Sequence, residues 1–158
     1  MKESIGGFSL FNIVIVFVLL FTGYVSISIN YSKAYNIKNE IINIIKNQNG
    51  ICTSNDPTNV VCYNFYVQIQ DYFKEVNYQN SGKCEDGWIG FGRDGLRIDD
   101  PNKNVAFCVK SISAGNSEFN NVVYYQVEVF YRFDLPIIGQ LFRFSVKGET
   151  PKIYSPNE

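Results

Sequence analysis

Four cysteines are the side chains of this 158-residue sequence with the clearest capacity for covalent chemistry. None of them has the C-x-x-C spacing of metal sites and redox motifs. An even number of such cysteines in a small domain without histidine is typical of disulfides formed in an oxidising compartment. Three pairings are possible, and the short sequence separations favour Cys52 with Cys62 and Cys84 with Cys108.

The sequence contains no histidine, which removes several classes of catalytic site. Ser-His-Asp and Cys-His catalysis, His-ligated zinc and an imidazole switch near neutral pH all need that side chain. The 14 Lys and Arg residues against 15 Asp and Glu give a net charge of -1, so there is no basic footprint for a phosphate backbone. We expect neither enzyme activity, nor a cofactor, nor a nucleic-acid partner.

The segment from Gly90 to Gly95 matches the pattern G-x-G-x-x-G of dinucleotide-binding proteins. In that fold a helix follows the motif and holds the pyrophosphate at its N-terminus. Here Leu96-Arg97-Ile98 alternates like a strand and is followed by the turn Asp99-Asp100-Pro101. The motif is therefore interpreted as a glycine-rich hairpin.

Several acidic residues near this motif could provide hard oxygen ligands for calcium, or a carboxylate pair for glycoside cleavage. Their spacing matches neither kind of site, so we expect solvated turns and no bound metal. These residues are Glu85, Asp86, Asp94, Asp99 and Asp100.

A long apolar run occupies the start of the chain. No charged residue occurs from Ser4 to Ser32, and residues 8–29 are mostly apolar. A bilayer core about 30 Å thick needs roughly 20 helical residues, and a lone strand would leave its backbone polar groups unpaired in lipid. We expect a transmembrane helix over residues 8–31, with a cleaved secretory signal ending near Ser26-Ile27-Ser28 as the alternative.

The charges that flank this run conflict with the cysteines over orientation. Lys33, Lys38 and Lys46 outnumber Lys2, which by the positive-inside rule favours a cytoplasmic C-terminal domain. The cysteines favour an oxidising exterior. We give the cysteines more weight because Glu40 dilutes the lysine excess, and expect a single-pass membrane protein with its C-terminal domain outside the cell.

Residues 32–50 are predicted to extend the transmembrane helix as an amphipathic helix. Asn49-Gly50 is expected to end it, because both residues tolerate the left-handed conformation. Gly23 is expected to bend the helix without breaking it. The apolar face is Ala34, Ile37, Ile41, Ile44, Ile45 and Gln48, and the opposite face carries Lys38, Asn39, Lys46 and Asn47.

Residues 51–158 are predicted to form an extracytoplasmic α+β domain in which a helix packs on an antiparallel sheet. The helix is expected from Pro57 to about Val76 with Asp56 as N-cap, although Val61 to Ile69 also alternates as a strand would. Period-two alternation predicts the strands. These are residues 88–91, 96–98, 105–113, 123–134 and 142–147.

The first residues, Met1 to Asn12, resemble a type IV prepilin. Such proteins have a short leader ending in Gly, then a Phe, a Ser/Thr-Leu pair and an apolar helix that continues into an amphipathic helix under a small α+β head. The resemblance implies that residues 1–7 are a leader, that Gly7 is its last residue, and that Phe8 is the mature N-terminus.

Asn12 departs from this family, which usually has Glu at the fifth mature position. That departure favours a minor subunit over a major filament subunit. From its chemistry, an amide near the start of a spanning helix either lies at the membrane interface or packs against a neighbouring helix. Both interpretations of Asn12 stay open.

Two segments near the C-terminus, Phe133 to Gly139 and Val146 to Thr150, are similar to small membrane-anchored proteins of TadE-like or conjugation-associated type. Together the resemblances imply a non-catalytic, pilin-like subunit or assembly factor of a surface filament or a conjugation or secretion apparatus. Its partners would be membrane lipid and sister subunits or assembly machinery. The alternative is a membrane-tethered extracellular module that binds cell-wall glycan or a peptide through exposed aromatics such as Tyr124 and Phe130.

Overall fold

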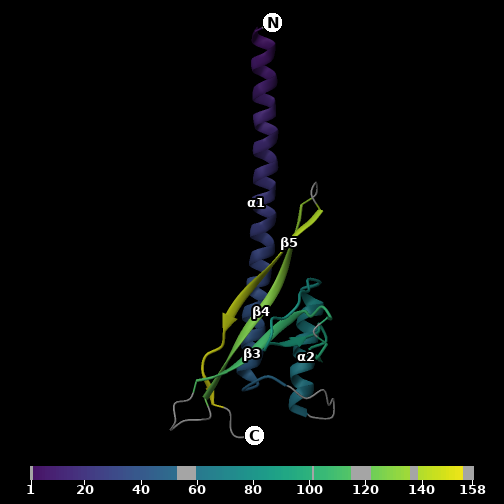
Figure 1. Cartoon of the computed structure of the whole chain (residues 1–158), viewed down its shortest axis with the longest axis vertical. Coiled ribbons are helices and arrows are strands. Elements are labelled where there is room, and N and C mark those ends of the chain that lie inside the picture. The colour runs from purple at the N-terminus through teal and green to yellow at the C-terminus, as the bar shows by residue number, and fades with distance from the viewer. Residues whose placement is uncertain (1, 53–59, 101, 115–121, 136–138, 155–158) are drawn as a thin grey trace.

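The computed structural model describes residues 2–52, 60–100, 102–114, 122–135 and 139–154, and it has the predicted α+β fold. Helix α1 projects far beyond a head in which a second helix and a sheet pack together (Figure 1). The described elements are α1 (Lys2–Asn47), α2 (Val60–Glu75), β1 (Ile89–Phe91), β2 (Arg97–Ile98), β3 (Phe107–Ser113), β4 (Val122–Leu135), β5 (Gly139–Glu149) and β6 (Ile153–Tyr154).

Helix α1 is one continuous element of 46 residues, so neither Gly23 nor the end of the apolar run interrupts it. Its C-terminal part packs on the head with the expected face, since Ala34, Ile37, Ile41, Ile44 and Ile45 are all buried. The large apolar side chains from Phe8 to Ile29 are exposed. The two parts of one helix therefore have opposite surroundings.

Lys38 corrects the prediction that it lies on the solvated face, because only 7% of it is exposed. Its aliphatic stem fills the space beside Gly148 of β5, where a Cβ would fall 2.6 Å from Lys38 Cδ. Its ammonium lies 4.0 Å from the centre of the Tyr35 ring. The long side chain thus covers apolar surface while its charge stays at the edge of the head.

Both helices end in a Schellman motif with asparagine in the left-handed conformation. At the end of α1, Asn49 (φ 55°) donates to the Lys46 carbonyl and Gly50 donates to the Ile45 carbonyl. At the end of α2, Asn77 (φ 47°) occupies the same position as Asn49. The Asn49-Gly50 stop expected from the sequence is confirmed.

The sheet is antiparallel with strand order β2-β1-β3-β4-β5, and β6 pairs with the start of β4. Strand β4 pairs with three other strands, because β3 pairs with residues 123–129, β5 with residues 126–135 and β6 with residues 122–123. The hairpin of β4 and β5 therefore continues beyond the end of β3 as a two-stranded arm. Both α1 and α2 cover one face of the sheet (Figure 1).

The core between helices and sheet is rich in aromatic rings. Phe91 and Phe107 stack with centroids 5.1 Å apart, and Phe65 meets Phe91 edge-on at 5.9 Å. Ile41 and Ile45 of α1 are fully buried in the same cluster. The alternating β4 residues Tyr125, Val127 and Val129 lie in the same cluster.

The strand boundaries differ from the predictions by one to three residues. The segment that also alternated like a strand is helical, so the helix interpretation is confirmed; its proposed start at Pro57 and the Asp56 cap lie outside the described residues. Strand β6 was not predicted, because two residues are too few to show a period. Val105 forms an isolated bridge with Gly82 and lies outside β3.

Candidate functional site

The second face of the sheet is covered in part by the chain that leaves α2. The Tyr78 hydroxyl donates a hydrogen bond to the Phe130 carbonyl, and burial raises the pKa of that hydroxyl. Gly82 then lies on the Phe130 ring, so closely that a Cβ at Gly82 would overlap it. The segment from Tyr78 to Trp88, called the crossing segment below, therefore covers part of β4.

This coverage corrects the expectation that Phe130 and Tyr124 are exposed aromatics. Only 7% of Phe130 is exposed, and it forms a small second core with Val105 and Cys108. Tyr124 is half-buried. A binding surface built on these two rings is therefore not available.

The four cysteines form the two pairs that their spacing favours. Cys52 and Cys62 join the end of α1 to the start of α2, with Cα atoms 5.2 Å apart. Cys84 and Cys108 join the crossing segment to β3, with Cα atoms 5.7 Å apart. The second bridge holds the crossing segment against the sheet.

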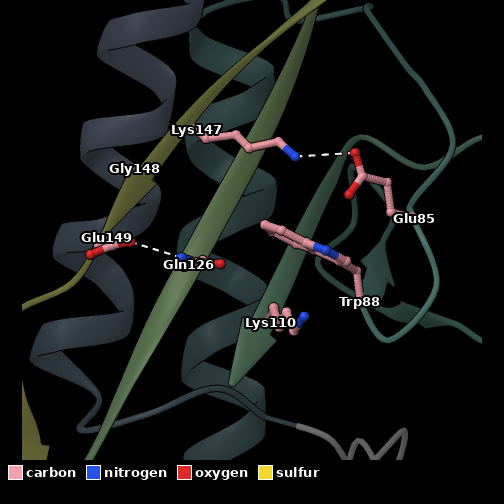
Figure 2. Close-up of a pocket in the computed structure, with 7 residues that line it drawn as sticks. All are labelled: Glu85, Trp88, Lys110, Gln126, Lys147, Gly148 and Glu149. Carbon is pink, nitrogen blue, oxygen red and sulfur yellow. Dashed lines mark hydrogen bonds and ion pairs between the residues drawn. The ribbon is translucent and has the colours of Figure 1, made fainter. Parts of the chain in front are cut away.

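An open hollow of about 520 Å³ lies on this face beside the bridge (Figure 2). Trp88 projects across the sheet from the crossing segment, and polar side chains from three strands surround it. The residues that line the hollow are Glu85, Trp88, Lys110, Gln126, Lys147, Gly148 and Glu149.

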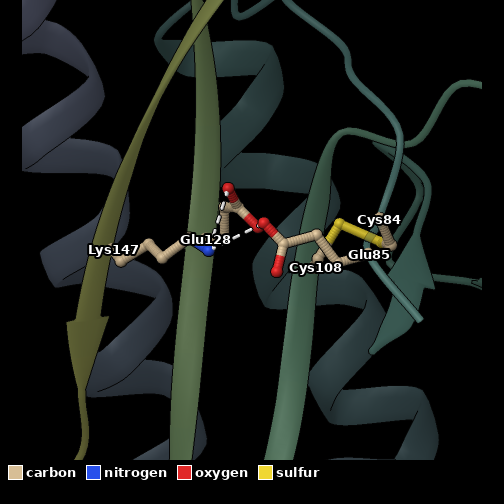
Figure 3. A network of polar contacts seen from close by, with 5 residues as sticks. All are labelled: Cys84, Glu85, Cys108, Glu128 and Lys147. Carbon is tan, nitrogen blue, oxygen red and sulfur yellow. Dashed lines mark hydrogen bonds and ion pairs between the residues drawn. A yellow bond between two sulfur atoms is a disulfide. The ribbon is translucent and has the colours of Figure 1, made fainter. Parts of the chain in front are cut away.

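Lys147 is the central cation of this site (Figure 3). Its Nζ lies 3.2 Å from Glu85 Oε1 and 3.7 Å from Glu128 Oε1, and 5.0 Å from the centre of the Trp88 ring. The hydrogen bond to Glu85 raises the pKa of the Lys147 ammonium, with a smaller contribution from the charge of Glu128. The Lys147 side chain is therefore protonated and positively charged at neutral pH.

Glu128 is the unusual member of the group, because only 4% of it is exposed. It stands between Cys108 and Lys147 in the cross-strand register. Oε1 faces Lys147, whereas Oε2 is buried and has no hydrogen-bond partner among the described residues. A buried carboxylate oxygen without a donor is costly, so this atom has an unused capacity to accept a hydrogen bond.

The arrangement is suited to binding a polar molecule. The Trp88 ring provides an apolar wall, while Lys110 and Lys147 provide cationic donors. The Gln126 amide already donates to Glu149 Oε1 at 2.7 Å. No three Cys, Asp or Glu side chains converge on a possible metal position within the part of the chain that the structure describes.

The residues singled out at the N-terminus lie far from this hollow, at the opposite end of the molecule. Gly7 and Phe8 belong to the first turns of α1, and Phe8 is exposed. The Asn12 amide donates to the Phe8 carbonyl at 3.1 Å, which uses one of its two protons. Both interpretations of Asn12 therefore stay predictions.

The sequence reasoning missed Trp88, Lys147 and Glu128 as a group, and placed Glu85 in a solvated turn. One signal was present: the row of β4 opposite its buried core face contains the rings of Tyr124 and Phe130 together with Glu128. Large rings in a row that also holds charges indicate that something covers part of that face.

The glycine-rich motif is a hairpin between β1 and β2, as expected. Gly92 donates to the Leu96 carbonyl at 2.8 Å, and Gly95 has a φ of 76°. A Cβ at Gly95 would lie 3.0 Å from the Tyr66 backbone, so glycine is needed both for its conformation and for the contact with α2.

Comparison with known proteins finds no matching family model, no matching curated protein and no matching solved structure. Within the described residues, one helix, α1, is long and apolar enough to cross a membrane, and none of its most apolar window is buried. Together with the disulfides of the head, this helix fits a single-pass membrane protein.

Proposed function

We propose that the protein is a non-catalytic, membrane-anchored, pilin-like subunit or assembly factor of a surface filament or of a conjugation or secretion apparatus. The observation that carries the proposal is the division of α1. Its apolar N-terminal part has no protein partner among the described residues, and its C-terminal part is a core element of the head. Such a helix can move from a bilayer into a bundle of like helices without refolding the head.

Two sequence features add support. The prepilin-like start supports a leader that ends before Phe8, and the disulfides agree with a head outside the cell. Asn12 provides a polar group near the mature N-terminus that can hydrogen-bond to a neighbouring helix.

The first test is the N-terminus of the protein isolated from its host. Mass spectrometry of the N-terminal peptide should show a chain that begins at Phe8. The variant Gly7→Val should retain its leader, while the matched control Gly6→Ala should be processed. An intact Met1, or a start after Ser28, would contradict the proposal.

The second test asks whether like helices surround the apolar part. Because all four native cysteines are paired, Leu20→Cys introduces a single reactive thiol into the exposed part of α1. Oxidation in host membranes should link this thiol to sister subunits carrying the same change. The control Tyr63→Cys, on α2, should give little linkage, and equal linkage at both positions would argue against helix packing.

A second candidate function is a membrane-tethered module that binds a cell-wall glycan or peptide. The hollow favours it, because an aromatic wall and two lysines lie close together there. The chain has a single tryptophan, so Trp88 itself reports on ligand binding.

Titration of the full-length protein in nanodiscs with muropeptides tests this candidate. Binding should change the Trp88 emission, and Lys147→Met should weaken the response. An unchanged emission spectrum with binding absent by calorimetry would reject the module and leave the pilin-like proposal intact.

A further inference from the structure

The arm formed by β4 and β5 runs back along α1 toward the membrane segment. At the start of β4, Tyr125 meets Gly50, just beyond the C-terminal end of α1. Six residues later, Tyr131 meets Tyr31 edge-on, with ring centres 6.1 Å apart. As β4 advances, its partners on α1 therefore move toward the N-terminus, as the direction of the hairpin in Figure 1 shows.

Tyr31 marks the end of the predicted transmembrane segment. A helix from Phe8 to Tyr31 is about 36 Å long, slightly more than the roughly 30 Å of a bilayer core. Tyr31 therefore lies at the level of the lipid headgroups if α1 crosses the membrane. The first cation after the apolar run, Lys33, lies two residues beyond Tyr31 and is exposed.

Strand β4 continues for four residues beyond Tyr131, to Leu135. At about 3.3 Å per residue these four residues add about 13 Å to the length of the arm. The hairpin is inclined to α1, so the advance along the axis of α1 toward the span is smaller than this length. An apolar helix about 36 Å long crosses a core about 30 Å thick at a tilt. When that tilt raises the hairpin, which diverges from α1 in Figure 1, the arm lies along the membrane surface and does not enter the hydrocarbon.

Two described residues on this face of the arm, one from each strand, are aromatic. Phe144 pairs with Tyr131 across the two strands, and the two rings stack with their centres 5.4 Å apart. The exposed fractions of Tyr31 and Phe144 are 49% and 44%, which is large for two rings that both pack against Tyr131.

Aromatic rings beside the end of an apolar span are typical of the aromatic belt at a membrane interface. The unpaired strand edges of the arm cannot enter the hydrocarbon, because their backbone groups would lose hydrogen bonds there. These two constraints place the arm in the headgroup region.

We propose that the arm of β4 and β5 rests on the outer surface of the bilayer that α1 crosses, with Tyr31, Tyr131 and Phe144 seated at the boundary between headgroups and acyl chains. The partner is therefore lipid, and the arm holds the head at a defined angle to the membrane. This inference rests on the proposed function only in requiring that α1 spans a bilayer.

The test uses full-length protein carrying Trp88→Phe, which removes the only native tryptophan. Three single tryptophans are then compared in nanodiscs of phosphatidylcholine and phosphatidylglycerol: Phe144→Trp in the arm, Leu20→Trp in the span and Tyr63→Trp on α2. All three native residues are exposed, so each ring can be accommodated without repacking the core. Circular dichroism before each experiment checks that the fold is retained.

Quenching by lipids brominated close to the headgroup is the measurement. Phe144→Trp should lose at least about half of its emission, as an interfacial ring does, while Tyr63→Trp should lose almost none. Leu20→Trp should be quenched more strongly by lipids brominated deep in the acyl chain.

Three outcomes would overturn the proposal, and they are distinguishable. If Leu20→Trp is quenched and Phe144→Trp is not, α1 spans the bilayer but the arm stands clear of it. A blue-shifted but unquenched Phe144→Trp would mean that protein, such as a second copy, covers the rings. If Leu20→Trp is also unquenched, the membrane anchor itself is wrong.

Discussion

The two parts of α1 both carry large apolar side chains but have opposite environments. Ile41 in the C-terminal part is fully buried beneath the sheet, while Ile15 in the N-terminal part is exposed along with its neighbours. Burial of an isoleucine side chain contributes about 1.5–3 kcal/mol, and the N-terminal part gains none of this within the chain. Its apolar surface must therefore be covered from outside, by lipid or by other helices.

The largest expected effect comes from testing this difference directly. Ile41→Ala should lower the free energy of unfolding of the head by about 2–5 kcal/mol, since it removes a buried side chain and leaves a cavity. The matched change Ile15→Ala should leave head stability unchanged. Trp88 fluorescence during urea unfolding of the detergent-solubilised chain provides the measurement, and equal losses for both variants would contradict the division of α1.

Removing the disulfides should have the next largest effect, and only on the head. In the chain-entropy model the 24-residue separation of Cys84 and Cys108 corresponds to about 3.4 kcal/mol, and the 10-residue separation of Cys52 and Cys62 to about 2.7 kcal/mol. The double serine variants should rank in that order in urea unfolding. Protein taken from the host should show no free thiol before reduction; four free thiols would contradict the exterior placement of the head.

A smaller effect is expected for the ion group on the open face. Lys147→Met leaves the buried Glu128 without its cation, and should lower head stability by about 1–2 kcal/mol, because the half-exposed lysine is partly screened by water. Adding Glu128→Gln should restore most of the loss. Failure of this double variant to recover would mean that Lys147 acts through packing on Trp88 instead.

The pH dependence of this effect follows from the raised pKa of Lys147. A group whose pKa is raised by folding contributes fully below its unfolded value, about 10.4, and loses the contribution as pH rises through the folded value. The stability difference between wild type and Lys147→Met should therefore be constant from about pH 6 to 9 and shrink in more alkaline solution. A difference that disappears near neutral pH would contradict the assignment.

The smallest effect is expected at Asn12, in the exposed part of α1. Asn12→Leu should leave membrane insertion and head stability unchanged, and reduce recovery in the assembled structure by an amount consistent with one interhelical hydrogen bond, about 0.6–2 kcal/mol. Quantitative blotting of membrane and assembled fractions measures both. Equal recovery of variant and wild type would leave only the interfacial interpretation.

Long periodic segments were predictable, whereas the open face was not. The apolar face of α1 and the alternation of β4 extend over many residues, so the pattern identifies both element and buried side. The end of α1 at Asn49-Gly50 was equally predictable, because few residue types tolerate the left-handed backbone conformation that ends a helix.

The errors concern residues whose environment depends on distant segments. Glu128 is buried only because the chain after α2 crosses the sheet and is tied to β3 by Cys84, and Lys38 only because β5 presents a glycine beside it. Sequence periodicity reports which side of an element a residue faces. It carries no information about what lies on that side.

The bridge between Cys52 and Cys62 determines how the molecule would respond to a pull along α1. When the head is pulled and the anchored helix resists, the force passes along the chain to the C-terminal end of α1. There the Cys52–Cys62 disulfide joins the end of α1 covalently to the first turns of α2. The load then passes across the bridge and not through the loop between the two cysteines. Reducing this bond would lengthen the loaded path by up to about 3.5 Å for each released residue, so the protein is built to transmit force with little extension.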